Sequence, residues 1–203
     1  MLEPSASPGA ALFVCAHGAG GRMDDRAMLA TSAALRGRGI DVVRFNFLYT
    51  ERGSRRPDPM PRLRECYEAV VAQVRRSDRR LIIGGRSMGG RVATMLAADG
   101  FACDGLLLFA YPLHPAGQPE KLRDAHLPSI KMPVLCFNGT RDALCRRDLM
   151  ERALQTVQTR WDMHWIDGAD HSLKGDKILA EIADATTAWL TGALRGAQVT
   201  PPL

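Results

Sequence analysis

The stretch of sequence that decides the fold reads Leu81-Ile82-Ile83-Gly84-Gly85-Arg86-Ser87-Met88-Gly89-Gly90. A short apolar run ends in glycines, and a run with helical character, residues 92–98, follows it directly. The pattern Gly-x-Ser-x-Gly in this setting is typical of a sharp turn from a strand into a helix, with the serine at its apex. Glycines suit the flanks of such a turn, because side chains there would collide with the neighbouring backbone. The alternative interpretation is a serine in a plain loop, since the pattern also arises by chance.

Six apolar runs alternate with amphipathic segments along the chain. The runs cover residues 11–16, 41–47, 81–84, 105–110, 133–138 and 161–166. The middle runs are almost continuously apolar, as expected for parallel strands that are covered on both faces. Helical segments lie between the runs, over residues 27–35, 63–74, 88–98, 144–157 and 178–189. This alternation predicts an α/β fold: a doubly wound, mainly parallel six-stranded sheet with helices on both faces.

Length and composition indicate a single globular domain. The chain has 203 residues, and its hydrophobic share of 46% and charged share of 24% are ordinary for such a domain. We expect a disordered lead over residues 1–10, one domain over 11–195 and a frayed tail over 196–203. No apolar run reaches the roughly 18 residues of a membrane span, and the lead lacks the pattern of a signal peptide.

The cysteines and the net charge narrow the class of protein further. The five cysteines are widely spaced and mostly lie in apolar runs, which favours reduced thiols and a cytoplasmic location. Their spacing does not match a metal site, so we expect neither a metal ion nor another cofactor. The net charge of +5 comes mainly from arginine, most densely over residues 75–80. Because no aromatic residues are interleaved with these arginines, we interpret the run as a solvated connection and not as a nucleic-acid site.

The first predicted strand continues into a glycine-rich loop, His17-Gly18-Ala19-Gly20-Gly21. This loop is neither a phosphate-binding loop nor a dinucleotide fingerprint, because the Lys-Ser/Thr pair and the third glycine are missing. The better interpretation is a loop that stabilises a negatively charged oxygen, with the Ala19 N–H acting beside that of Met88. A flexible turn at the end of the strand is the alternative. His17 is then a turn residue, and we assign it no role as a base.

An acid and a histidine follow the last two predicted strands. Asp142 lies just beyond the fifth strand and His171 just beyond the sixth. Open parallel sheets place their sites at the carboxyl edge, so both side chains should lie near Ser87. The order Ser87, Asp142, His171 predicts a nucleophile, an acid and a base. The alternatives are a helix N-cap at Asp142 and an ordinary loop histidine at His171, with Glu51 and Asp170 as the next candidate acids.

These motifs together resemble the α/β-hydrolase superfamily, close to the small, capless dienelactone-hydrolase-like branch that includes the testis-expressed hydrolase-like proteins. The segments that carry the resemblance are 17–21, 44–47, 85–91, 111–115, 138–142 and 168–171. The resemblance implies a minimal α/β-hydrolase fold without a large cap, since residues 111–132 are too few to form one. It also departs from the family in one respect, because dienelactone hydrolases proper use a cysteine nucleophile where this chain has serine. Some relatives in the branch act as subunits of complexes.

The sequence therefore predicts a serine hydrolase that cleaves a small ester, thioester or related acyl substrate. The alternative is a catalytically weak interaction or scaffold protein with the same fold. Candidate substrate-lining residues are His17, Gly18, Gly20, Arg86, Tyr111 and His114. The arginine-rich loop over residues 49–57 favours a substrate with an anionic group, unless its arginines only solvate the loop. We expect a small-molecule partner and neither nucleic acid nor membrane, and the sequence does not predict an oligomeric state.

Overall fold

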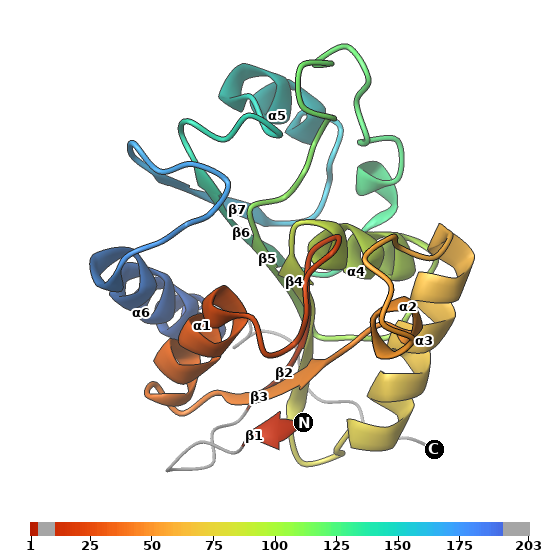
Figure 1. Cartoon of the computed structure of the whole chain (residues 1–203). Helices are drawn as coiled ribbons and strands as arrows, with labels where there is room; N and C mark the ends of the chain where they lie inside the picture. The colour runs from red at the N-terminus through yellow and green to blue at the C-terminus, as the bar shows by residue number, and fades with distance from the viewer. Residues whose placement is uncertain (4–10, 193–203) are drawn as a thin grey trace.

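One seven-stranded sheet runs through the molecule, which we describe from a computed structural model for residues 1–3 and 11–192 (Figure 1). The strand order is β1-β3-β2-β4-β5-β6-β7. The strands are β1 (Leu2–Glu3), β2 (Ala11–Ala16), β3 (Asp41–Phe45), β4 (Arg80–Arg86), β5 (Gly105–Phe109), β6 (Val134–Gly139) and β7 (Trp161–Ile166). Strands β2 to β7 are parallel to one another, which confirms the predicted α/β sheet and its six parallel strands.

The chain start differs from the prediction. Leu2–Glu3 form β1, which pairs antiparallel with β3, and the N-terminal ammonium donates a hydrogen bond to the Arg44 carbonyl oxygen (2.6 Å). The outer edge of β3 offers unpaired backbone groups, and a short extended segment can satisfy them without any sequence pattern of its own. The expectation of a disordered lead is therefore wrong for the first three residues. The rest of that lead (residues 4–10) and the predicted tail (196–203) lie outside the described residues.

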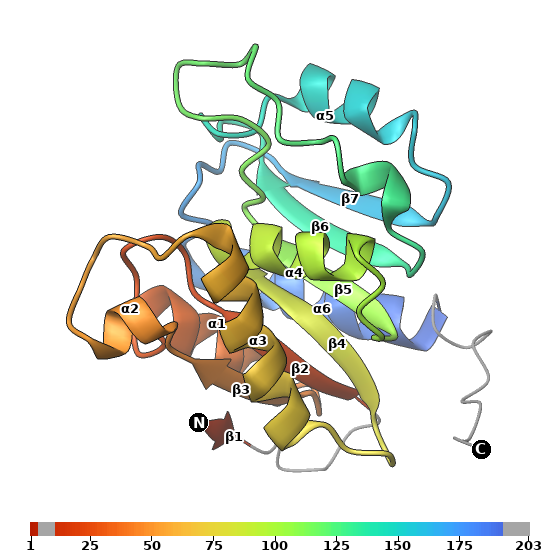
Figure 2. The ribbon, with the colours of Figure 1, turned by 90° about the vertical axis from the view of Figure 1, so that its right-hand side faces the viewer.

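Helices cover both faces of the sheet (Figures 1 and 2). One face carries α1 (Arg26–Arg36) and α6 (Asp176–Gly192), which lie side by side. The opposite face carries α3 (Met60–Val74), α4 (Met88–Ala98) and α5 (Arg147–Leu154). Two short pieces, α2 (Leu48–Glu51) and a 3₁₀ turn (Leu127–Ser129), were not expected from the sequence, because pieces of this length show no helical period.

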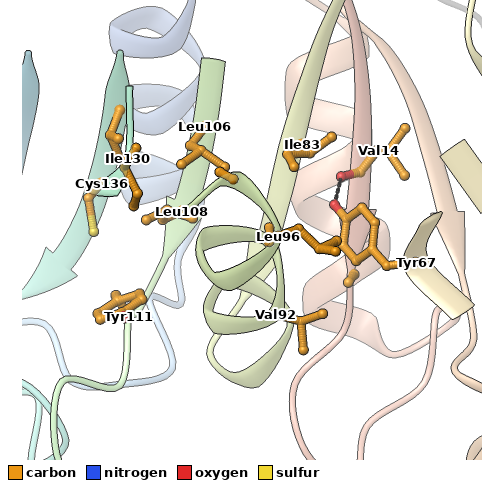
Figure 3. Close-up of a cluster of buried hydrophobic side chains, with 14 of the residues drawn as sticks. Val14, Tyr67, Ile83, Val92, Leu96, Leu106, Leu108, Tyr111, Ile130 and Cys136 are labelled. Carbon is orange, nitrogen blue, oxygen red and sulfur yellow. Dashed lines mark hydrogen bonds between the residues drawn. The ribbon is translucent and has the colours of Figure 1, made fainter. Parts of the chain in front are cut away.

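Two hydrophobic cores follow from the alternation of strand side chains between the two faces. The larger core packs the sheet against α3, α4 and α5, and Figure 3 shows Val92 and Leu96 of α4 beside Ile83 and the Tyr67 ring. The Tyr67 hydroxyl donates to the Val14 carbonyl oxygen and accepts from the Gly84 N–H (2.8 Å). This buried phenol therefore fixes α3 against β2 and β4, the two strands that lead into the candidate site.

The arginine run at residues 75–80 is more structural than the sequence suggested. Arg79 forms a largely buried ion pair with Asp41 at the start of β3, and Arg75 donates to the Ala102 carbonyl oxygen (3.1 Å). Arg80 is already the first residue of β4. The interpretation as a solvated connection is therefore wrong for Arg79 and Arg80, whereas Arg75 is exposed as expected. Within the described residues, no helix is long and apolar enough to cross a membrane.

Candidate active site

Ser87 occupies a strained turn between β4 and α4. Its backbone angles are φ 50° and ψ −116°, a conformation that side-chain-bearing residues adopt rarely. The Ser87 N–H donates to the Phe109 carbonyl oxygen of β5 (2.9 Å), which holds the apex against the neighbouring strand. Strained residues of this kind persist where the surrounding structure fixes them, and they concentrate at functional sites.

The glycines on either side of Ser87 are required by close backbone contacts. A Cβ atom added to Gly85 would lie 2.2 Å from the Ala16 carbonyl oxygen, and one added to Gly89 would lie 2.4 Å from the same atom. Real Cβ atoms do not approach carbonyl oxygens this closely, so β2, β4 and α4 can meet here only if both residues are glycine. The turn therefore has the geometry that the Gly-x-Ser-x-Gly pattern predicts, and the plain-loop alternative is wrong.

A continuous chain of hydrogen bonds joins Ser87, His171 and Asp142. His171 Nε2 lies 3.0 Å from Ser87 Oγ, and His171 Nδ1 lies 2.8 Å and 3.0 Å from the two carboxylate oxygens of Asp142. Since a carboxylate only accepts, Nδ1 carries the proton and Nε2 is left to accept from the serine hydroxyl. The Asp142 side chain is fully buried, whereas the His171 side chain is 31% exposed and therefore accessible to a substrate.

The turns that carry Asp142 and His171 are joined to each other. The Arg141 N–H donates to the Ala169 carbonyl oxygen (2.9 Å), and the Thr140 N–H donates to that of Ile166 (3.0 Å). A Cβ atom on Gly139 would lie 2.1 Å from the Ala169 carbonyl oxygen, so only glycine allows the two turns to approach this closely. The two turns therefore hold the acid and the histidine in a fixed relative position.

Asn138 is a site residue that the sequence analysis missed. Its amide nitrogen donates to Asp142 Oδ2 (3.2 Å), and its amide oxygen accepts from the Tyr111 N–H (3.0 Å). The Leu144 N–H donates to the other Asp142 oxygen (2.8 Å). Helix α5 begins only at Arg147, so the N-cap alternative for Asp142 is wrong. The position of Asn138 could have indicated its role, because a side-chain amide within an otherwise apolar strand needs a hydrogen-bond partner.

Arg86 holds the loop that carries the histidine. Its Nη2 donates to the carbonyl oxygens of His171 (2.7 Å) and Ser172. Burial lowers the pKa of the Arg86 guanidinium, because the charged form loses part of its hydration. Arg86 thereby links the end of β4 to the histidine loop, and its role in lining the substrate site stays a prediction. No local pattern signals a contact between segments this far apart in the sequence.

The glycine-rich loop after β2 lies against the serine turn. A Cβ atom on Gly18 would contact the Ser87 Cβ at 3.4 Å, and the Gly21 N–H closes the loop on the Gly18 carbonyl oxygen (3.1 Å). In the described part of the chain, the Ala19 N–H has no acceptor. Met88 is the first residue of α4, so its N–H has no acceptor within the helix. Both donors are therefore available to an oxygen bound beside Ser87.

His17 supports this loop from the interior of the protein. It is completely buried, its Nδ1 bonds to the Gly18 carbonyl oxygen (2.8 Å) and its Nε2 accepts the Phe47 N–H (3.2 Å). Burial lowers the pKa of His17, so the imidazole is neutral at physiological pH. The expectation that His17 lines the substrate site is wrong, because its ring cannot reach the surface. Gly20, by contrast, is exposed, and its N–H donates to the Tyr49 hydroxyl (3.3 Å).

Tyr111 and His114 also support the site without lining it. Both side chains are buried, so this part of the prediction is wrong as well. The Tyr111 hydroxyl donates to the Arg123 carbonyl oxygen (3.3 Å), and His114 Nε2 accepts the Arg146 N–H (3.1 Å). The second contact joins the loop after β5 to the segment between Asp142 and α5. The motif around these residues indicated that they lie near the site. It could not indicate that their side chains are buried, because burial depends on contacts distant in sequence.

Other candidate residues have different partners. Asp170 accepts hydrogen bonds from the Ser172 N–H (2.8 Å) and hydroxyl, and Glu51 accepts from the Asn46 amide (2.8 Å). Neither carboxylate is bonded to His171, so Asp142 is the acid that the geometry selects. All five cysteines are free. Within residues 1–3 and 11–192, no group of three or more His, Cys, Asp or Glu side chains is arranged to hold a metal ion.

Parallel strands with a serine at one strand-to-helix turn, and an acid and a histidine on two further turns, define the α/β-hydrolase class of proteins. A model of the alpha/beta hydrolase domain family matches residues 9–191, and the chain belongs to this family. Among solved structures, an α/β serine hydrolase homologue from Coxiella burnetii is 20% identical, with a TM-score of 0.77 over 94% of this chain and 90% of that one.

Two further solved structures support the same fold. Dienelactone hydrolase from Anabaena variabilis is 20% identical, with a TM-score of 0.72 over 96% of this chain and 91% of that chain. A serine hydrolase without a lid from Xanthomonas campestris is also 20% identical, with a TM-score of 0.68 over 99% and 89%. The small, capless architecture expected from the sequence is thus the observed one.

Proposed function

We propose that the protein is a serine hydrolase that cleaves a small ester, thioester or related acyl substrate. The observation that carries this proposal is the hydrogen-bond chain from Ser87 through His171 to Asp142. The strained serine turn and the two backbone donors beside it are further support. An interaction protein would need none of these features in combination.

The reaction follows from the roles that these groups take. His171 Nε2 accepts the hydroxyl proton while Ser87 Oγ attacks the acyl carbon, and the N–H groups of Ala19 and Met88 stabilise the developing oxyanion. His171 then donates the proton to the leaving group, which departs and leaves an acyl-enzyme. Water attacks this intermediate with His171 again as the base, and Ser87 is regenerated. Asp142 keeps the imidazole in the correct tautomer and stabilises its charged form.

The structure allows the proposed preference for an anionic substrate to be assigned to one arginine. A cavity of about 190 Å³ lies next to the glycine-rich loop, with Gly20 and Arg55 in its lining. Arg52 is paired with Asp58 (2.7 Å), whereas Arg55 has no ion-pair partner among the described residues. We therefore assign Arg55 as the group that favours an anionic substituent on the acyl substrate.

Two matched esters, one neutral and one bearing a carboxylate, test this substrate preference. We expect a higher kcat/KM for the carboxylate ester, an advantage that shrinks with added salt and in Arg55→Ala. Arg38→Ala, which removes an exposed arginine in the turn that follows α1, is the control. Equal kcat/KM values for the two esters at low ionic strength would contradict the preference.

Steady-state hydrolysis of a small ester tests the proposed reaction itself. We expect Ser87→Ala to lower kcat by about 10⁴-fold or more and to leave the melting temperature close to that of the wild type. Ser129→Ala, at an exposed position of the 3₁₀ turn, serves as the matched control and should retain full activity. A Ser87→Ala protein with substantial activity contradicts the proposal.

Two finer assignments belong to the same proposal. We place the chain in the small dienelactone-hydrolase-like branch that includes the testis-expressed hydrolase-like proteins, on the motifs given above. We also propose a cytoplasmic location, which the five free cysteines support because thiols persist in a reducing compartment.

A further inference from the structure

A second cavity, of about 500 Å³, lies behind the histidine loop. Its walls come from α1, from the residues that follow His171 and from the start of α6, two helices that lie side by side in Figure 1. Its volume is within the range of about 300–1,000 Å³ that is usual for small-molecule sites. Ser87, His171, Ala19 and Met88 do not line it, so a molecule bound there does not occupy the position of the reacting acyl group.

The charges around this cavity are mostly positive. Arg26, Arg86 and Lys174 line it, against the single acid Asp176, which gives a balance of three minus one, or +2. None of the three cations forms an ion pair with a carboxylate within the described residues. Arg86 is the most buried of them, and the carbonyl groups that it bonds do not neutralise its charge. Arg86 is half-buried, and a cation that is partly removed from water and has no carboxylate partner offers an anionic ligand a charge-assisted contact.

The remaining walls are mainly apolar, with Thr31 and Ser172 as the polar exceptions. Ala27 and Ala30 of α1 face the cavity from one side, and Leu173 and Leu179 line it from the other. An inorganic anion would leave this surface uncovered, whereas an alkyl chain would cover it at a gain of about 25 cal/mol per Å². The combination of one cationic region and one apolar region therefore fits an amphipathic anion.

We propose that this cavity is a binding site for a small carboxylate with a short apolar chain. Arg86 and Lys174 hold the carboxylate, and the chain packs against Ala30 and Leu179. Ser172 and Leu173 line the cavity and Arg86 bonds to the His171 carbonyl oxygen, so the ligand lies directly against the histidine loop. The site is independent of the proposed hydrolysis, and its test does not depend on turnover.

Calorimetric titration with hexanoate at neutral pH tests the site, with 1-hexanol and hexylammonium as neutral and cationic probes of equal chain length. We expect saturable binding of one hexanoate per chain and no saturable binding of the other two probes. Absence of hexanoate binding, or equal binding of hexanoate and hexanol, would overturn the proposal.

Two substitutions separate this cavity from the serine site, where a carboxylate could bind as a product. Lys174→Ala should weaken hexanoate binding by roughly tenfold, the loss of one charge-assisted contact. Ala30→Trp should fill the cavity and abolish binding, while Ala33→Trp, on the exposed side of the same helix, should leave it intact. Circular dichroism confirms that each variant is folded, and Lys174→Ala carries the test if Ala30→Trp is not. Hexanoate affinity that Lys174→Ala leaves unchanged would place the ligand elsewhere and overturn the proposal.

Discussion

In the proposed mechanism Asp142 acts only through His171, and a single-atom change can isolate that effect. In Asp142→Asn one carboxylate oxygen becomes an NH2 group, which donates a hydrogen bond to Nδ1 where the carboxylate accepted one. The imidazole proton then lies on Nε2, which can no longer accept the Ser87 hydroxyl proton. We expect kcat for a small ester to fall by about 10⁴-fold with little change in KM. Asp170→Asn is the matched control, because that carboxylate bonds only to Ser172 and should be nearly silent. The reverse ranking of the two variants would mean that the acid is Asp170.

Arg86 is a positioning residue in this account, since it touches the backbone of the histidine loop and not the reacting atoms. We expect Arg86→Ala to lower kcat by about 10- to 100-fold through misplacement of His171, with KM little changed. Arg86→Lys should recover part of the lost kcat, because an ammonium can still donate to one of the two carbonyl oxygens. Steady-state kinetics alongside melting temperatures provide the check. A fall in melting temperature with unchanged kcat would show that Arg86 serves stability alone.

His126 makes folding stability depend on pH. It lies 2.9 Å from Thr94 Oγ1, and burial, followed by the nearby Arg91 charge, lowers the pKa of His126 to about 4. The unfolded chain therefore binds a proton that the folded chain does not, over the interval from about pH 6.5 down to about 4. The folded protein therefore has its full stability above the His126 pKa of the unfolded chain. It loses part of that stability as the pH falls toward the His126 pKa of the folded chain.

Urea unfolding at pH 7 and at pH 4 measures this effect. We expect the wild type to lose about 1–2 kcal/mol more of its unfolding free energy than His126→Gln across this interval, after allowance for solvent screening at a partly exposed site. Titration of the carboxylates is common to both proteins and cancels in the comparison. Parallel pH profiles of the two proteins would contradict the assignment.

The close contact between β2 and α4 requires glycine at position 89, and its loss should destabilise the fold. In Gly89→Val a Cβ atom would lie 2.4 Å from the Ala16 carbonyl oxygen, so α4 must move away from the strand. We expect the unfolding free energy to fall by more than about 3 kcal/mol, or the protein not to fold. Gly192→Val is the control, because a Cβ atom at the end of α6 meets nothing within 4 Å. A Gly89→Val protein with an unchanged melting temperature would contradict the description of this turn.

Elements with a strong hydrophobic period could be predicted from the sequence, and elements without one could not. The six long strands are mostly continuous apolar runs, and helices such as α3 and α4 carry a period near 3.6; both patterns reflect the burial of the element itself. Strand β1 has two residues and α2 has four, too few to show a period, and β1 takes its backbone partners from β3. Helix α5 begins three residues later than the apolar pattern suggested, because Asp142 and the segment after it are held in a turn by the site.

At the scale of the whole molecule, the candidate site is assembled from four turns at the carboxyl edge of the sheet. Ser87, Asp142 and His171 could be placed there from chain order alone, because parallel topology brings strand ends together. Asn138 and the Arg86 contact could not, since hydrogen bonds between distant turns leave no local pattern. His17, Tyr111 and His114 lie on the right segments, but the sequence could not show that their side chains are buried beneath the site.

The central claim is that Ser87 is a nucleophile activated by His171 and Asp142. Its most direct test is labelling of the full chain with a fluorophosphonate, followed by peptide mass spectrometry, for wild type, Ser87→Ala and the Ser129→Ala control. We expect one phosphonyl adduct, on Ser87, in the wild type and in Ser129→Ala, and none in Ser87→Ala. Folded wild-type protein that carries no adduct on Ser87 would contradict the account and favour an interaction protein with the same fold.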